Sequence, residues 1–152
     1  MRALFMGFFL YLIAVAAVRA EAPVFRREPV TVVTATGETE FSAEIAETDA
    51  QQEYGLMFRY TLPPDRAMLF DFGRVRKVAM WMKNTYIPLD MVFIRADGAV
   101  SSVAESTVPH SLEVIASQEP VLAVLELAAG TARRIGLKPG DKVYHRIFKP
   151  AP

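Results

Sequence analysis

The chain has 152 residues, which suits a single domain, and it carries 17 basic and 17 acidic side chains and no cysteine. The lack of cysteine excludes a disulfide framework, a thiolate nucleophile and a lipid-bearing cysteine behind a leader sequence. Without residues 1–20, which include Arg2 and Arg19, the net charge is near −2. This balance argues against a nucleic-acid partner, because such a partner needs a concentrated basic surface.

Residues 1–20 have the features of a secretory signal peptide. Arg2 gives a positive start, an uncharged apolar run extends from Ala3 to Val18, and Val18-Arg19-Ala20 suits cleavage before Glu21. The apolar run is shorter than the roughly 20 residues that span a bilayer. We therefore expect an exported protein, periplasmic or secreted, with no stable membrane insertion after cleavage. An uncleaved N-terminal membrane anchor is the alternative.

The first predicted elements follow a flexible lead-in over residues 21–28. A β-branched run from Val30 to Ala35 and an alternating segment from Thr39 to Ala46 predict a hairpin. The sequence Thr48-Asp49-Ala50-Gln51 matches a capping box, and it predicts a helix that continues to about Arg59. The hairpin should bury one face, made of Phe41, Ala43 and Ile45.

The second half of the chain consists of short apolar runs separated by turn signals. Asp97-Gly98 marks the clearest hairpin turn, and the run before Glu126 has the composition of a central strand. The predicted strands are Ala67 to Phe72, Val78 to Met82, Leu89 to Arg95, Ala99 to Glu105, Val121 to Leu127 and Lys142 to Phe148, with a short helix or turn over Ala128 to Gly136.

This succession of seven or eight short strands with one or two short helices predicts a mainly β protein. Turn signals recur every eight to twelve residues, and no long helix alternates with the strands. We expect one domain over residues 29–149, either a β-sandwich or an open barrel, rather than a parallel α/β sheet.

Known catalytic and metal-binding motifs are absent from the sequence. The two histidines, His110 and His145, are far apart and have no carboxylate at a usual ligand offset, so no metal site is predicted. No glycine-rich phosphate loop or nucleophile elbow is present, and no cofactor is expected. We interpret His145 as a surface or packed residue and keep His110, in a loop, as a secondary candidate for a binding site.

Polar residues within apolar segments define the candidate site. Strand alternation places Trp81 and Lys83 on one face and Val78, Met80 and Met82 on the other. The remaining candidates are Asn84, where this strand ends, Asp90, which begins the next strand, and Glu126 and Arg59.

Glu126 is the most informative of these residues, because it shares a strand face with Leu122 and Val124. A buried, unpaired carboxylate would cost several kcal/mol or would stay protonated. Either Glu126 forms an internal ion pair with a cation such as Lys83 or Arg59, or it faces a water-filled pocket. Arg59 also suits a helix C-terminus, where the helix dipole favours a cation.

Several segments also carry a family resemblance. In order and spacing, "YGLMFRYTLPPDRAMLFDF", "MWMKNTYIPLDMVFI", "VPHS", "VLELAAG" and "GLKPGDKV" resemble the family called domain of unknown function 192, from about Val30 to Phe148. Ala67, where the family often has glycine, and Met80, where an aromatic residue is common, are small departures. The resemblance implies a mainly β, jelly-roll-like domain that is often exported or membrane-anchored. It implies no established activity, cofactor or catalytic residue.

Three functions are compatible with these residues. The first is a non-catalytic binding or accessory domain of the cell envelope, which would hold a small polar ligand, such as a saccharide, between Trp81 and the polar candidates. The second is a metal-independent hydrolase or lyase, with Glu126 or Asp90 as the acid or base and Lys83 as the electrostatic stabiliser. The third is a protein-interaction module with an exposed apolar patch around Trp81, Met80 and Tyr86.

Overall fold

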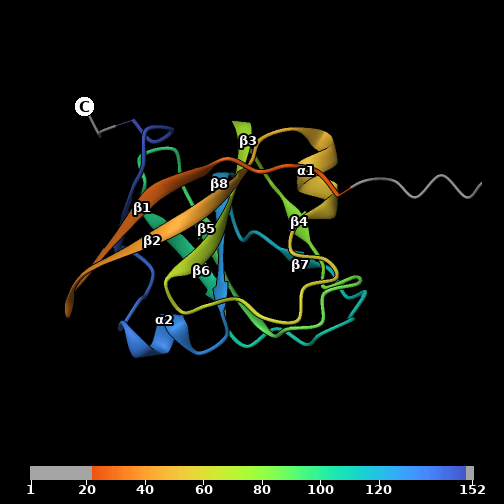
Figure 1. The fold of residues 1–152 in the computed structure, drawn as a ribbon. Coiled ribbons are helices and arrows are strands. Elements are labelled where there is room, and N and C mark those ends of the chain that lie inside the picture. The colour runs from red at the N-terminus through yellow and green to blue at the C-terminus, as the bar shows by residue number, and fades with distance from the viewer. Residues whose placement is uncertain (1–21, 150–152) are drawn as a thin grey trace, which may run out of the picture.

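The computed structural model describes residues 22–149, so the predicted signal peptide lies outside the described residues. These residues form nine strands and two short helices (Figure 1). Their order is β1 (Arg27–Thr34), β2 (Gly37–Ala46), α1 (Asp49–Tyr54), β3 (Arg66–Arg76), β4 (Ala79–Met80), β5 (Leu89–Ile94), β6 (Val100–Ala104), β7 (Ile115–Ala116), β8 (Val121–Ala128), α2 (Thr131–Arg134) and β9 (Lys142–Tyr144).

Seven of the strands form one curled sheet in the order β6-β5-β8-β3-β2-β1-β9. Neighbouring strands are antiparallel except for β2 and β3, which run parallel with α1 in the connection between them. β4 and β7 make a separate two-stranded sheet, which lies on the same side of the molecule as α1 (Figure 1). The prediction of a mainly β fold with one or two short helices is confirmed, in its open-barrel form.

The large sheet is curled into a half-barrel, so that its two edge strands, β6 and β9, approach each other. Val143 N donates to Gly98 O at 2.8 Å, and Val100 N donates to Asp141 O at 2.8 Å. Ala99 and Lys142 form an isolated bridge at the same place. These bonds link the start of β6 to β9 at opposite ends of the strand order.

The sheet separates two apolar clusters. The first draws side chains from all seven strands of the large sheet and is completed by residues of the α2 region, such as Ala132 and Leu137. The second lies on the opposite face and is covered by Leu56 from the segment after α1 and by Val78 and Met82 beside β4. Burying both faces of the central strands explains why β8 is apolar on both alternations.

Predicted elements occur in their expected places, but several differ in length. β3 extends to Arg76 instead of ending at Phe72. The capping box of α1 is present, but the helix ends at Tyr54 rather than near Arg59, because Gly55 adopts φ +49° and its amide closes the last turn onto Gln51. The strand predicted over Val78 to Met82 is reduced to β4, and the final strand is reduced to β9.

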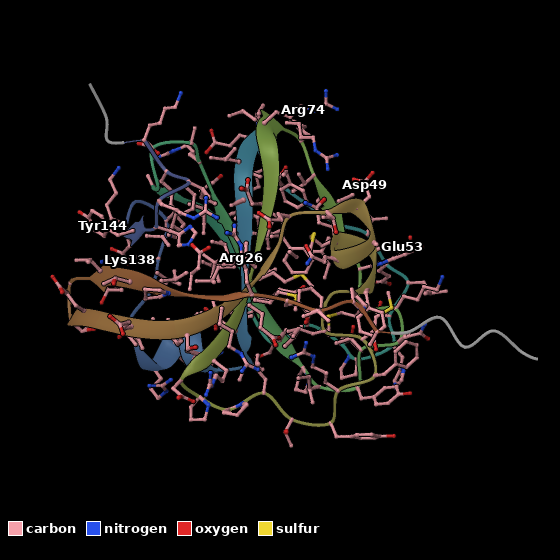
Figure 2. All side chains as sticks on the ribbon, turned by 45° about the horizontal axis from the view of Figure 1, so that its top comes forward. Arg26, Asp49, Glu53, Arg74, Lys138 and Tyr144 are labelled. Carbon is pink, nitrogen blue, oxygen red and sulfur yellow. The ribbon has the colours of Figure 1, made fainter. Side chains whose placement is uncertain are left out.

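Charged side chains surround this core on the outside. Figure 2 shows Asp49 and Glu53 on α1, Arg74 towards the end of β3, and Lys138 on the other side of the molecule. Within residues 22–149, no helix is both long and apolar enough to cross a membrane.

Candidate functional site

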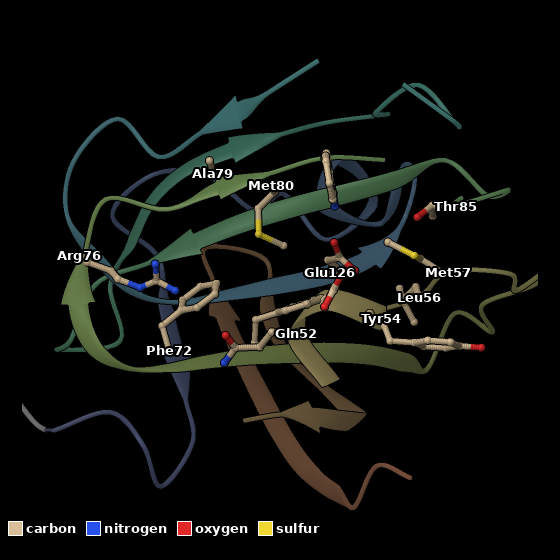
Figure 3. Close-up of a pocket in the computed structure, with 14 residues that line it drawn as sticks. Gln52, Tyr54, Leu56, Met57, Phe72, Arg76, Ala79, Met80, Thr85 and Glu126 are labelled. Atoms are coloured by element: carbon tan, nitrogen blue, oxygen red, sulfur yellow. The ribbon is translucent and has the colours of Figure 1, made fainter. Parts of the chain in front are cut away.

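A cavity of about 260 Å³ lies against the second apolar cluster, between α1, the end of β3 and β4. Glu126 lies at its base and is only 4% exposed. In Figure 3 its carboxyl group points into the space between Met80 and Gln52, with Arg76 at one end and Thr85 at the other. The full lining is Gln52, Glu53, Tyr54, Gly55, Leu56, Met57, Phe70, Phe72, Arg76, Ala79, Met80, Trp81, Thr85 and Glu126.

Burial gives this carboxyl group unusual chemistry. Desolvation raises the pKa of Glu126 from an ordinary 4.5 to about 8, and the positive charge of Arg59 opposes the shift only in part. No hydrogen bond or ion pair from residues 22–149 reaches the Glu126 carboxyl group. Glu126 is therefore a neutral acid at pH 7, and it can both donate and accept a hydrogen bond in the cavity. Of the two alternatives for Glu126, the structure has the pocket and not the ion pair.

Strand register explains why the positive charge of Arg59 acts on the pKa of Glu126. Arg27, Glu44, Met68, Glu126 and Met91 are consecutive partners across β1, β2, β3, β8 and β5, so they form one row across the sheet. Glu44, two strands from Glu126, forms ion pairs with both Arg27 and Arg59. One acid of the row thus has two cationic partners, and the other has none.

Trp81 forms part of the cavity wall and is 45% exposed. Lys83 Nζ lies 4.9 Å from the centroid of the Trp81 ring, in a cation–π contact. A second cavity, of about 340 Å³, shares Trp81 with the first and is also lined by Lys83 and Asn84. Met82 is fully buried whereas Trp81 and Lys83 are exposed, but Met80, predicted on the face of Met82, lines the cavity together with Trp81.

Backbone hydrogen bonds join three loops beside Trp81: the loop between α1 and β3, the loop between β4 and β5, and the loop between β6 and β7. Phe58 N donates to Asn84 O at 2.8 Å, and His110 N donates to Thr85 O at 3.1 Å. Phe58, Asn84 and His110 all have positive φ, between 54° and 64°, which is rare for residues other than glycine and is costly for a bulky side chain such as that of Phe58. The His110 ring packs on Tyr86 with their centroids 5.0 Å apart. His110 and Asn84 are thus placed in the loops that border the site.

Asp90 does not lie in the cavity, because it belongs to the other face of the sheet. Its Oδ1 accepts a hydrogen bond from Ser106 N and its Oδ2 accepts one from Ala132 N, each at 2.9 Å. Asp90 is fully buried, and both of its carboxylate oxygens are occupied. Of the two acids named in the hydrolase or lyase interpretation, only Glu126 therefore lies at the cavity.

Arg59 does not form the rim of this cavity either. It lines a separate pocket with its ion-pair partner Glu44, and its guanidinium lies 5.8 Å from the centroid of the Phe25 ring. His145 is packed, as interpreted, and its Nε2 lies 2.8 Å from a Glu28 oxygen. Over residues 22–149, no group of three His, Asp or Glu side chains is arranged to hold a metal ion.

Sequence reasoning missed most of the cavity wall. Phe70 and Phe72 lie on either side of Asp71 in β3, and Arg76 lies over the Phe72 ring at 4.9 Å. Gln52 is held in place by hydrogen bonds from its Nε2 to Asp71 O (2.6 Å) and Ala46 O (3.3 Å). Only the pairing of β3 with β8 brings these residues to Glu126, and a local pattern cannot predict that pairing.

The curled sheet places the chain among mainly β half-barrel domains, and comparison with known proteins gives the family. The model of the family described as DUF192, uncharacterized ACR, matches residues 31–145. The chain belongs to the DUF192 family.

Two solved structures are similar to this chain. One, from Sinorhizobium meliloti and described as a "putative transcription regulator", is 50% identical, with a TM-score of 0.77 over 79% of this chain and 94% of that chain. The other, a protein of unknown function from Novosphingobium aromaticivorans, is 40% identical, with a TM-score of 0.78 over 90% of this chain and 99% of that one. No curated protein matches.

Proposed function

We propose that this protein is an exported, non-catalytic binding domain of the cell envelope that holds a small, uncharged polar ligand in the Glu126 cavity. One observation carries the proposal: a buried carboxyl group faces a cavity and has no hydrogen-bonding partner in the part of the chain that the structure describes. The carboxyl oxygens of Glu126 reach the open cavity, so a ligand there can form a hydrogen bond with them that no side chain of residues 22–149 supplies.

The chemistry of the wall indicates the kind of ligand. The neutral form of Glu126 offers one donor and acceptor sites, which match a hydroxyl or amide group better than an ion. Tyr54, Phe72 and Trp81 supply flat apolar surfaces against which a ring can pack. A saccharide combines hydroxyl groups with apolar ring faces, so it is the ligand class that we propose first.

Fluorescence of Trp81, the only tryptophan in the chain, tests the proposal directly. Titration with a panel of mono- and disaccharides and peptidoglycan fragments at pH 7 should give a saturable change for at least one member. Glu126→Leu should abolish that change, whereas Glu126→Gln, which keeps a neutral donor and acceptor, should retain binding. A panel that leaves the emission unchanged would count against the proposal.

The pH dependence separates an uncharged ligand from a cationic one. A ligand that needs the protonated acid should lose affinity above about pH 8, by up to about tenfold per pH unit, because Glu126 ionises there. A ligand with a positive charge should instead bind more tightly as pH rises through the same range. Affinity that increases above about pH 8 would contradict the assignment of an uncharged ligand.

A protein-interaction module is the second candidate, and exposed apolar side chains at the joined loops favour it. Tyr60 is 78% exposed, and Phe58, Val108 and Leu112 are also exposed. Phe58→Ser and Tyr60→Ser should leave a saccharide response at Trp81 intact but weaken binding of a protein partner. Loss of the saccharide response in these variants, with the fold retained, would place the saccharide at the joined loops rather than in the Glu126 cavity.

A further inference from the structure

We propose that the separate pocket lined by Glu44 and Arg59, at the other end of the row that contains Glu126, is a binding site for a tetrahedral oxoanion of the sulfate or phosphate type. The pocket has a volume of about 260 Å³ and does not include Glu126. Its polar lining consists of Arg27, Ser42, Glu44, Arg59, Thr61 and Arg66. Nothing in the proposed function requires this pocket, so the two proposals stand independently.

Positively charged side chains outnumber negatively charged ones in the lining of this pocket. Three guanidinium groups, from Arg27, Arg59 and Arg66, share a single pocket-lining carboxylate, that of Glu44. Arg27 Nη2 donates to Glu44 Oε1 at 3.1 Å, and Arg59 Nη1 pairs with Oε2, so both oxygens of Glu44 are already bound. Asp65 lies 3.8 Å from Arg66 Nε and is largely exposed outside the lining. The pocket therefore carries excess positive charge.

The guanidinium groups are held in place before any ligand arrives. Arg27 lies directly across from Glu44 in the β1–β2 register, and Arg66 lies across from Ser42 in the β2–β3 register. Arg59 is fixed between Glu44 and the Phe25 ring. Such preorganisation lowers the entropy that a bound anion would otherwise cost.

Donor groups remain for a ligand in this arrangement. Each guanidinium carries five N–H donors, of which the contacts described above use one or two. The Ser42 Oγ accepts a hydrogen bond from Arg66 Nη1 at 2.9 Å, which leaves its own hydrogen free to donate. Leu62, Pro63 and Ala67 complete the wall of the pocket. Planar guanidinium forks and a hydroxyl donor suit the oxygens of sulfate or phosphate.

Titration with sodium sulfate and with sodium phosphate, at constant ionic strength kept with sodium chloride, tests the site by NMR. Backbone amides near residues 59–67 and the Arg66 Nε–H should shift in a saturable way. Arg66→Met should weaken binding about tenfold while leaving the two Glu44 ion pairs intact. Arg66→Lys, which keeps the charge but loses the fork, should fall between Arg66→Met and the unmodified protein.

Arg74→Met is the matched control, because it removes one charge from an exposed position near the other end of the same strand. It should leave the affinity unchanged. Shifts that grow linearly with anion concentration, or that weaken equally in Arg66→Met and Arg74→Met, would overturn the site. Glucose 6-phosphate should compete with inorganic phosphate for the same amides, and tighter binding of the sugar phosphate would assign the site to an oxoanion carried on an organic group.

A second readout connects this pocket to Glu126 without depending on any ligand of the first cavity. Arg59 is the charge that lowers the pKa of Glu126, so an anion bound at Arg59 should weaken that influence and raise the pKa further above about 8. The Glu126 side-chain carbon resonance, followed through a pH titration with and without sulfate, should report the rise. Binding of sulfate with no change at Glu126 would place the anion away from Arg59 and contradict the site as described.

Discussion

Glu126 makes the stability of the protein depend on pH at the scale of one residue. Below about pH 4.5 it is neutral in the folded and unfolded states. Between about pH 4.5 and 8 the unfolded chain releases a proton that the folded protein retains, so the free energy of unfolding falls as pH rises, at up to about 1.4 kcal/mol per pH unit. Above about pH 8 both states are ionised and this dependence ends.

Glu126→Gln should remove this contribution, because glutamine is neutral at every pH and has nearly the same shape. Urea unfolding at about pH 5 and about pH 8 should show a smaller loss of stability with pH for the variant than for the unmodified protein. Glu38→Gln, the same chemical change at an exposed position of β2 away from the cavity, is the control and should follow the unmodified protein. Parallel pH profiles for all three proteins would show that Glu126 is not the neutral acid described above.

The contrast between Glu126 and Asp90 shows what sequence can predict about single residues. The alternation of β8 was sufficient to predict a carboxylate that is buried among apolar side chains. It could not predict which of two buried acids has hydrogen-bonding partners, because the partners of Asp90 are amides of Ser106 and Ala132, 16 and 42 residues away along the chain. Such contacts depend on the path of loops, and loop paths leave little periodic signal.

At the scale of elements, Asp90 joins β5 to α2 and to the segment after β6. Asp90→Ala should lower the free energy of unfolding by about 2–4 kcal/mol, because two charge-assisted hydrogen bonds are lost and two amides lose their acceptor. Asp90→Asn keeps one carbonyl acceptor and should lose about half as much. Chemical denaturation measures both values, and an equal loss for the two variants would show that the hydrogen bonds are not the cause.

The capping box of α1 is a second contribution at this scale. Gln51 N donates to Thr48 Oγ1 at 3.3 Å, and Thr48 N donates to Gln51 Oε1 at 3.1 Å. Thr48→Ala should destabilise the fold by about 1 kcal/mol, whereas Thr48→Ser, which keeps the hydroxyl, should cost much less. Thermal unfolding of the two variants makes the comparison, and a similar fall for both would exclude the cap as the source.

Element lengths show the limit of local patterns. The alternation and the capping box correctly located the first hairpin and the start of α1, because both depend on neighbouring residues. The end of α1 was predicted too late, since Tyr54, Met57 and Phe58 continue an apolar spacing that the chain does not follow beyond Gly55. There Phe58 has a left-handed backbone conformation, and its amide donates a hydrogen bond to the carbonyl of Asn84. This long-range contact overrides the helix periodicity.

At the scale of the whole molecule, Gly98 allows the sheet to curl until its two ends meet. A Cβ atom at Gly98 would lie 2.4 Å from Val143 O, and the residue has φ +79°. Gly130 has a similar φ of +82° but open space around it, so Gly130→Ala measures backbone strain alone. Gly98→Ala should destabilise the protein more than Gly130→Ala does, by at least about 1 kcal/mol, in chemical denaturation. Equal effects would mean that the close approach of β9 is not needed for stability.

The meeting of β6 and β9 also has a consequence for how separate copies of the chain behave. β9 pairs with only three residues of β1, yet it covers backbone groups that would otherwise form an open edge. Lys142 places a charged side chain there, in an ion pair with Asp97. If the chain stopped before Lys142, β1 would present unpaired amides and carbonyls to other molecules, and such an edge invites strand-to-strand aggregation. We therefore expect these few residues to protect the chain from edge-to-edge association as well as to complete the fold.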